Sequence, residues 1–267
     1  MHTQNESPSE GAARLSRQML NKVPAVTAFF WIIKILCTTV GETAADFLNT
    51  NLHLGLTKTT YVMGGLLAVV LLFQFMFRKY VAGIYWLAVV LLSIVGTLIT
   101  DNLTDNFGVS LVTTTIIFSV ALAATFGTWY ASEKTLSIHS ITTTRREAFY
   151  WMAILFTFAL GTAAGDLIAE KLKVGYPLSV LLFGVLIGLT ALAHFRFRLN
   201  GILAFWIAYI LTRPLGASLG DLLSQSHADG GLGLGTVGTS VLFLSLILGL
   251  VIYLTVTRKD LAAAEAK

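Results

Sequence analysis

Aspartate recurs at one position of a repeated pattern. Four times along the chain, a Trp is followed ten residues later by a Gly and five residues after that by an Asp. Carboxylate oxygens are the ligands that hard cations such as Mg²⁺ and Mn²⁺ prefer, so the pattern indicates cation chemistry if the fold gathers these side chains. The single Cys and the five His show no spacing typical of a zinc or copper site. The recurring aspartates are Asp46, Asp101, Asp166 and Asp221.

Two copies of the pattern carry further charges. Lys34 and Glu42 lie in the first copy, and Arg213 lies in the fourth. Ionisable side chains inside an apolar segment are costly, so each is a hypothesis of function. Arg213 and Asp221 are eight residues apart on the same predicted helix, too far for direct contact. We therefore expect Arg213 to pair with Glu42 or Asp46 on another helix. Such a contact is either a structural ion pair or a charge balance for the carboxylates.

The segments that carry these residues are long and apolar. The chain of 267 residues is 55% hydrophobic and 12% charged, against about 25% charged for an ordinary soluble domain. Its apolar residues gather in blocks of about 20, the length of a helix that crosses a bilayer. A transmembrane β-barrel would show short alternating segments instead. The predicted spans are 24–48, 59–77, 82–100, 109–131, 148–169, 177–195, 201–222 and 236–256.

Four tandem repeats follow from the spacing of the pattern. Successive Trp residues of the pattern are 55, 65 and 55 positions apart, a period that indicates a copied supersecondary unit. Each repeat supplies a motif helix and a plainer return helix. We therefore predict an all-α integral membrane fold of eight transmembrane helices, arranged as four tandem hairpins that are pseudo-symmetric about the membrane normal. The predicted divisions are a tail (1–23), repeats at 24–80 and 81–135, a linker (136–147), repeats at 148–199 and 200–258, and a tail (259–267).

Either a fourfold ring or two paired halves would satisfy this repeat arrangement. The longer step between the second and third Trp contains the loop Ser132–Glu147 and slightly favours two halves. Residues 1–20 and those after Lys259 have the composition of disordered tails.

Trp, Gly and Asp share one face of the motif helix on a helical wheel. Polar residues at intermediate positions fall on the same face, and the opposite face is aliphatic, so the motif face should point into the bundle. Each Gly either lets helices pack closely or starts an unwound segment beside a cavity. Each Trp is either an interfacial belt residue or part of the core or a cavity wall. These positions are Trp31, Trp86, Trp151, Trp206, Gly41, Gly96, Gly161 and Gly216.

Basic residues concentrate on one side of the predicted spans. The positive-inside rule then places both termini in the cytoplasm and the aspartates near the outer boundary. We interpret the basic clusters as topology signals, and expect no nucleic-acid partner. They comprise Arg14, Arg17, Lys22, Arg78, Lys79, Lys134, Arg145, Arg146, Arg196, Arg198, Arg258, Lys259 and Lys267.

The sequence resembles a family of bacterial multi-pass membrane proteins built from four tandem two-helix repeats, each with a characteristic Trp. Trp31, Trp86, Trp151 and Trp206 match that Trp, and the resemblance covers about Pro24 to Arg258. It implies the fold and the topology only. The location that we predict is the bacterial inner membrane. The family has no established function, so the resemblance implies no catalytic or binding residue.

Transport of a small cation is the function that these residues favour. The expected substrate is a divalent metal ion of the Mg²⁺ or Mn²⁺ type, with protons as the counter-ion and Glu42, the deepest acid, as the coupling residue. The rival hypothesis is a membrane scaffold or sensor in which the motif only packs helices. No pattern supports an enzyme, no cofactor is expected, and the expected partners are the lipid bilayer, the cation and protons. The predicted pathway contains Glu42, Asp46, Asp101, Asp166 and Asp221, all candidate metal ligands, with Thr38, Thr97 and Thr162, and with Lys34 and Arg213 as charge-balancing residues.

Overall fold

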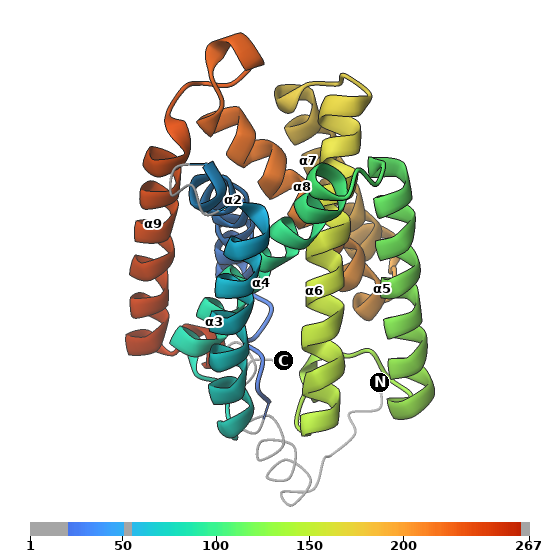
Figure 1. The fold of residues 1–267 in the computed structure, drawn as a ribbon. Helices are drawn as coiled ribbons and strands as arrows, with labels where there is room; N and C mark the ends of the chain where they lie inside the picture. The colour runs from blue at the N-terminus through green and yellow to red at the C-terminus, as the bar shows by residue number, and fades with distance from the viewer. Residues whose placement is uncertain (1–20, 51–54, 263–267) are drawn as a thin grey trace, which may run out of the picture.

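A computed structural model describes residues 21–50 and 55–262 (Figure 1). All regular elements within this part of the chain are helical, and eight of the helices are long and apolar enough to cross a membrane. The predicted all-helical fold with eight spans is confirmed. The long helices are α2 (Ala28–Thr50), α3 (Leu56–Met76), α4 (Ala82–Asp101), α5 (Leu111–Glu133), α6 (Thr144–Asp166), α7 (Tyr176–Phe197), α8 (Gly201–Ser224) and α9 (Gly235–Thr257).

The four motif helices form a closed ring at the centre of the bundle. α2 packs against α4, α4 against α6, α6 against α8, and α8 against α2. Because the first and last motif helices are in contact, the four repeats form one ring rather than two separate halves. The longer step between the second and third repeats is taken up by a short 3₁₀ segment, Ile138–Ser140, before α6.

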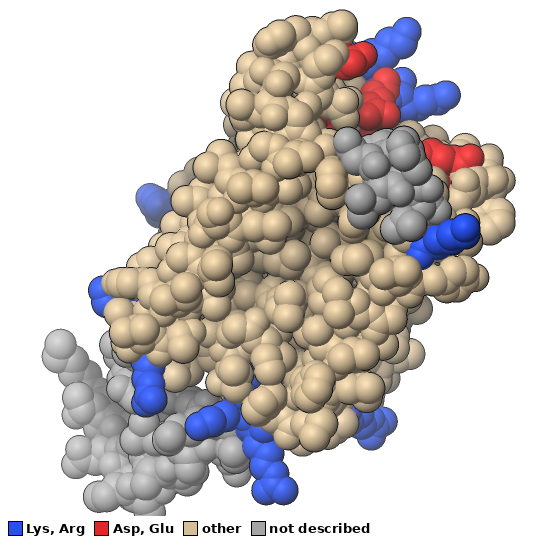
Figure 2. Space-filling view, turned by 60° about the vertical axis from the view of Figure 1, so that its left-hand side comes forward, with Lys and Arg blue, Asp and Glu red and all other residues tan. Residues whose placement is uncertain are grey.

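Each return helix packs mainly against the motif helix of the next repeat. α3 packs against α4, α5 against α6, α7 against α8, and α9 returns to α2. The sequence repeat is therefore not the packing unit, since each outer helix joins two successive repeats. The outer helices expose most of their apolar side chains, and on the face drawn in Figure 2 a broad uncharged band separates two charged ends. This is the surface expected of helices that face lipid.

The motif helices continue through their glycines without unwinding. Gly41, Gly96, Gly161 and Gly216 all lie within α-helix. The geometry changes only beyond the aspartates of two repeats, where π-helical segments cover Asn102–Asn106 and Leu167–Lys171. Wider π turns of this kind are frequent near functional sites. The structure thus favours packing over unwinding as the role of the glycines.

The bundle includes residues that the sequence places in the linker and tails. α6 begins at Thr144, inside the predicted linker, because the Thr143 hydroxyl caps it by accepting a hydrogen bond from the Arg146 amide. Lys22 and Asp260, assigned to the two tails, are 6% and 3% exposed. Residues 1–20 and 263–267 of the predicted tails lie outside the described residues.

Candidate functional site

An aromatic layer closes the ring where the motif helices begin, which we call the Trp end. The aromatic residue before each motif Trp packs against the Trp of the next repeat. Trp86, Trp151 and Trp206 are buried and Trp31 is half-buried, which supports core packing over a belt at the membrane interface. The ring centroids are 5.6 Å apart for Phe30–Trp86, 5.4 Å for Tyr85–Trp151, 6.3 Å for Tyr150–Trp206 and 5.6 Å for Phe205–Trp31.

The four motif glycines, each ten residues after a motif Trp, form the next layer of the ring. A Cβ atom added to any of these four glycines would collide with the residue seven positions after the Trp of the next repeat. The glycines are therefore required for the close approach of neighbouring motif helices. The distances from the added Cβ are 1.9 Å to Ser93 for Gly41, 2.7 Å to Phe158 for Gly96, 2.4 Å to Arg213 for Gly161 and 2.1 Å to Thr38 for Gly216.

Arg213, in the fourth repeat, lies in the interior of this ring and contacts the three other repeats. Its side chain is fully buried, and its Nη2 atom donates to Glu42 Oε2 at 2.7 Å, the pairing that we expected with either Glu42 or Asp46. Nη2 also contacts the hydroxyls of Thr97 and Thr162, the latter at 2.7 Å. Glu42, Thr97 and Thr162 occupy one position, eleven after the Trp, in three repeats.

Thr38, unlike Thr97 and Thr162, contacts Arg213 through its backbone rather than through its hydroxyl. Its backbone carbonyl accepts a hydrogen bond from Arg213 Nη1 at 3.4 Å. Its hydroxyl lies within hydrogen-bond distance of backbone carbonyls, including that of Thr212 at 3.2 Å. Thr38 therefore helps to hold α2 against α8.

Three of the five predicted carboxylates form one group at the opposite, Asp end of the motif helices. Glu42, Asp46 and Asp221 each offer a carboxylate oxygen, and these oxygens lie within 4.8 Å of one another. Glu42 and Asp221 are buried, and Asp46 is half-buried. They meet because α2 and α8 are neighbours in the closed ring. This acidic group is the part of the described chain whose donor set suits a hard cation.

Asp101 and Asp166 lie outside this acidic group. Each is half-buried and directly precedes a π-helical segment. The structure therefore does not gather all five predicted metal ligands at one point.

Lys34 does not meet the carboxylates that it was expected to balance. It is fully buried, and its Nζ atom lies 4.2 Å from the ring centroids of both Phe158 and Tyr209. Nζ has no hydrogen-bond partner among the described residues, so cation–π attraction is the favourable contact that the structure gives it. Helical side chains lean toward the helix N-terminus, which carries this ammonium group toward the Trp end and away from Glu42.

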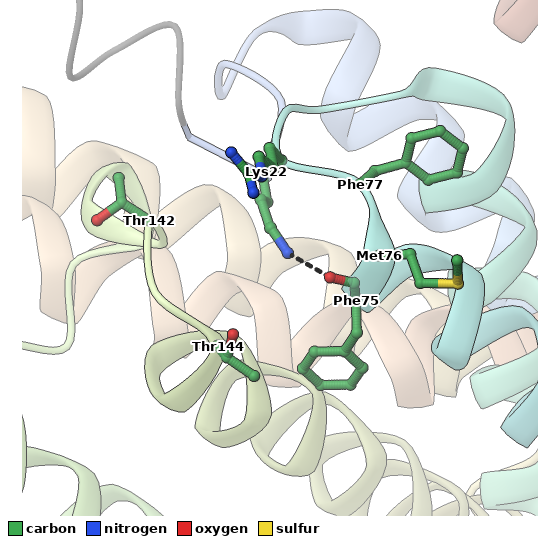
Figure 3. Close-up of a pocket in the computed structure, with 7 residues that line it drawn as sticks. Lys22, Phe75, Met76, Phe77, Thr142 and Thr144 are labelled. Atoms are coloured by element: carbon green, nitrogen blue, oxygen red, sulfur yellow. Dashed lines mark hydrogen bonds between the residues drawn. The ribbon is translucent and has the colours of Figure 1, made fainter.

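A second buried ion pair, which the sequence did not predict, lies at the Trp end. Lys22 Nζ is 2.5 Å from Glu147 Oε2. It also donates to the Phe75 carbonyl at 3.1 Å, the contact drawn in Figure 3. Gln74 and Trp151 also donate to the Glu147 carboxylate. The signal in the sequence was the position of Glu147, four residues before a motif Trp and hence on its face. A cavity of about 330 Å³ lies beside the pair, between the end of α3 and the start of α6.

The fold and this buried polar centre define a multi-pass membrane protein made of four tandem repeats. The chain belongs to the family of a repeat of unknown function (DUF347), whose model matches it four times, at residues 29–80, 84–135, 149–200 and 204–260. The family indicated by the four Trp residues is thereby confirmed. No curated protein and no solved structure matches the chain.

Proposed function

We propose that this protein transports a small hard cation, of the Mg²⁺ or Mn²⁺ type, across the bacterial inner membrane in exchange for protons. The observation that carries the proposal is the acidic group of Glu42, Asp46 and Asp221, whose oxygens lie within 4.8 Å of one another at the inner face of the ring. Three carboxylates offer the oxygen ligands and negative charge that a divalent hard cation requires.

The burial of the central side chains suggests how such a site is reached. Asp46, Asp101 and Asp166 are half-buried, so solvent reaches the Asp end of the ring. Arg213 and Lys34 are buried and lie between the acidic group and the aromatic layer that closes the Trp end. This arrangement suits a state in which the cation site is open at one end and shut at the other, as alternating access requires. The positive-inside rule places the open end outside and both termini in the cytoplasm.

Charge balance supports protons as the exchanged ion. The acidic group carries three formal negative charges close together, and one of its members, Glu42, is paired with Arg213. Crowded carboxylates do not all ionise, so protons share this group when no metal ion is bound. Metal entry then expels protons, and returning protons expel the metal. Glu42 couples the two steps, since it belongs both to the acidic group and to the Arg213 pair.

Metal flux in proteoliposomes tests the proposal. The key variant is Asp221→Asn, because Glu42→Gln would also leave the buried Arg213 unpaired, at a cost of about 3–5 kcal/mol. We expect Asp221→Asn to abolish Mn²⁺ flux driven by a pH gradient. Asp101→Asn, at the same motif position but outside the acidic group, is the matched control and should retain part of the flux. Flux in Asp221→Asn equal to that of the unsubstituted protein would refute the assignment.

A membrane scaffold or sensor is the second candidate. The closed rings of Trp and Gly contacts favour it, because packing alone accounts for those motif positions. Packing does not account for the buried Lys34, Glu42 and Arg213, each of which is costly in a bilayer. If the purified protein moves none of a panel of divalent ions while remaining folded, the scaffold hypothesis replaces transport.

A further inference from the structure

The atom Arg213 Nη2 has more oxygen neighbours than it has hydrogens. Glu42 Oε2 and Thr162 Oγ1 each lie 2.7 Å away, and Thr97 Oγ1 is also in contact. A guanidinium Nη atom carries two hydrogens, so it cannot give each of three acceptors a hydrogen bond of its own. At least two of the three oxygens therefore share one hydrogen.

Both threonines present only lone pairs to this point. The Thr97 hydroxyl donates to the Ser93 carbonyl and the Thr162 hydroxyl to the Phe158 carbonyl, each at 3.1 Å. Their single hydrogens are thus used within their own helices. Together with the Glu42 carboxylate they form an oxygen cage, defined by Glu42 Oε2, Thr97 Oγ1 and Thr162 Oγ1. A spherical ion would satisfy all three acceptors, because its attraction has no preferred direction.

The oxygen cage follows the repeat symmetry of the ring of motif helices. Its three oxygens come from the same motif position in the first three repeats, and the fourth repeat has Ala217 there. The fourth repeat instead supplies the cation inside the cage, from Arg213 one helical turn earlier. Three repeats therefore supply the oxygens of the cage, and the fourth repeat supplies the side chain that occupies it.

We propose that the oxygen cage is a binding site for a monovalent hard cation of the sodium class, and that Arg213 Nη2 takes the place of this ion in the state described here. The cage has one carboxylate and two neutral hydroxyls, so its formal charge of −1 matches one positive charge. Replacing the guanidinium with Na⁺ leaves that balance unchanged. A divalent ion is better matched by the acidic group, where Asp46 and Asp221 add two negative charges.

The surroundings of Arg213 allow it to leave the cage. Its Nε atom is buried and has no hydrogen-bond partner among the described residues, so its polar contacts are confined to the two Nη atoms. Its aliphatic stem lies against Gly161, which has no side chain to obstruct it. Pro214 has no N–H, so α8 lacks one backbone hydrogen bond beside Arg213 and can bend there. This inference rests on the proposed function only in one respect: the oxygen cage and the acidic group both contain Glu42.

Sodium-dependent stability of an Arg213→Met variant tests the inference. Met matches the aliphatic stem of Arg and has no guanidinium group, so it empties the cage while keeping the packing of the stem. With the protein purified in sodium and then exchanged at constant ionic strength, we expect Na⁺ to raise the unfolding temperature saturably and N-methylglucamine to have no such effect. Adding Thr97→Val, which keeps the side-chain shape, should abolish the response. Equal responses to the two cations, or a response unaffected by Thr97→Val, would overturn the proposal.

Binding of ²²Na⁺ to the unsubstituted protein keeps the inference testable if Arg213→Met does not fold. The unsubstituted protein should bind ²²Na⁺ measurably, and the Thr97→Val/Thr162→Val variant should bind it at least tenfold more weakly. If the unsubstituted protein does not bind ²²Na⁺ and Arg213→Met does not fold even in sodium, the cage is not a sodium site. Asp221→Asn separates the two proposals, because it should stop Mn²⁺ flux and spare ²²Na⁺ binding, whereas Thr97→Val should weaken ²²Na⁺ binding.

Discussion

Replacing Gly96 with Ala should weaken the contact between α4 and α6. The added Cβ would lie 2.7 Å from Phe158 Cβ and 3.2 Å from the Ala159 backbone nitrogen, whereas ordinary contacts begin at 3.4 Å. The shortfall against Phe158 is 3.4 − 2.7, or about 0.7 Å. No rotamer change relieves it, because the two obstructing atoms are a Cβ and a backbone atom. The helices must move apart, and overpacking of this kind costs roughly 1–3 kcal/mol.

The matched control is Gly127→Ala on the outer helix α5. Gly127 is exposed, and an added Cβ would meet nothing within 4 Å. Ala has a higher helix propensity than Gly, so each substitution stabilises its helix by about 1 kcal/mol. This contribution cancels when the two variants are compared. The difference in their free energies of unfolding therefore measures the overpacking cost alone. We expect Gly96→Ala to be the less stable by about 1–3 kcal/mol.

Reversible denaturant unfolding of the purified protein in detergent micelles, followed by Trp fluorescence, measures this difference. The two variants should unfold with similar denaturant dependence, so that the midpoints reflect stability. Equal free energies of unfolding for Gly96→Ala and Gly127→Ala would refute the conclusion that the motif glycines exist for close helix packing. That result would favour the alternative, in which each motif glycine starts an unwound segment beside a cavity.

Three further experiments test the packing and the orientation. Trp151→Ala should cost about 3 kcal/mol in the same unfolding assay, as large core truncations do, whereas an interfacial belt role would leave stability almost unchanged. Glu147→Gln should cost about 3–5 kcal/mol because it leaves the Lys22 ammonium buried and unpaired, and adding Lys22→Met should recover most of that loss; no recovery would contradict the ion-pair explanation. With the native Cys replaced, Ser226→Cys should react with an impermeant thiol reagent from outside the cell and Ser140→Cys should not. The reverse labelling pattern would invert the proposed orientation.

The sequence alone determined the spans, the repeat and the inward direction of the motif face. These features are local, because the length of an apolar block and the 100° turn between helical residues do not depend on the neighbours of a helix. Trp, Gly and Asp at fixed spacing therefore had to share one side of each motif helix. The polar residues on that side, Glu42 and Arg213 among them, had to share the bundle interior for the same reason.

Only the tertiary structure decided which of these residues meet. A helical wheel gives the direction of a side chain but not the identity of the helix opposite it. Glu42 and Arg213 are 171 positions apart, and they pair because the last motif helix closes the ring against the first. The same closure brings Asp221 to Asp46 and leaves Asp101 and Asp166 outside the acidic group. The cation–π contacts of Lys34 likewise depend on α6 and α8, which no spacing within α2 could reveal.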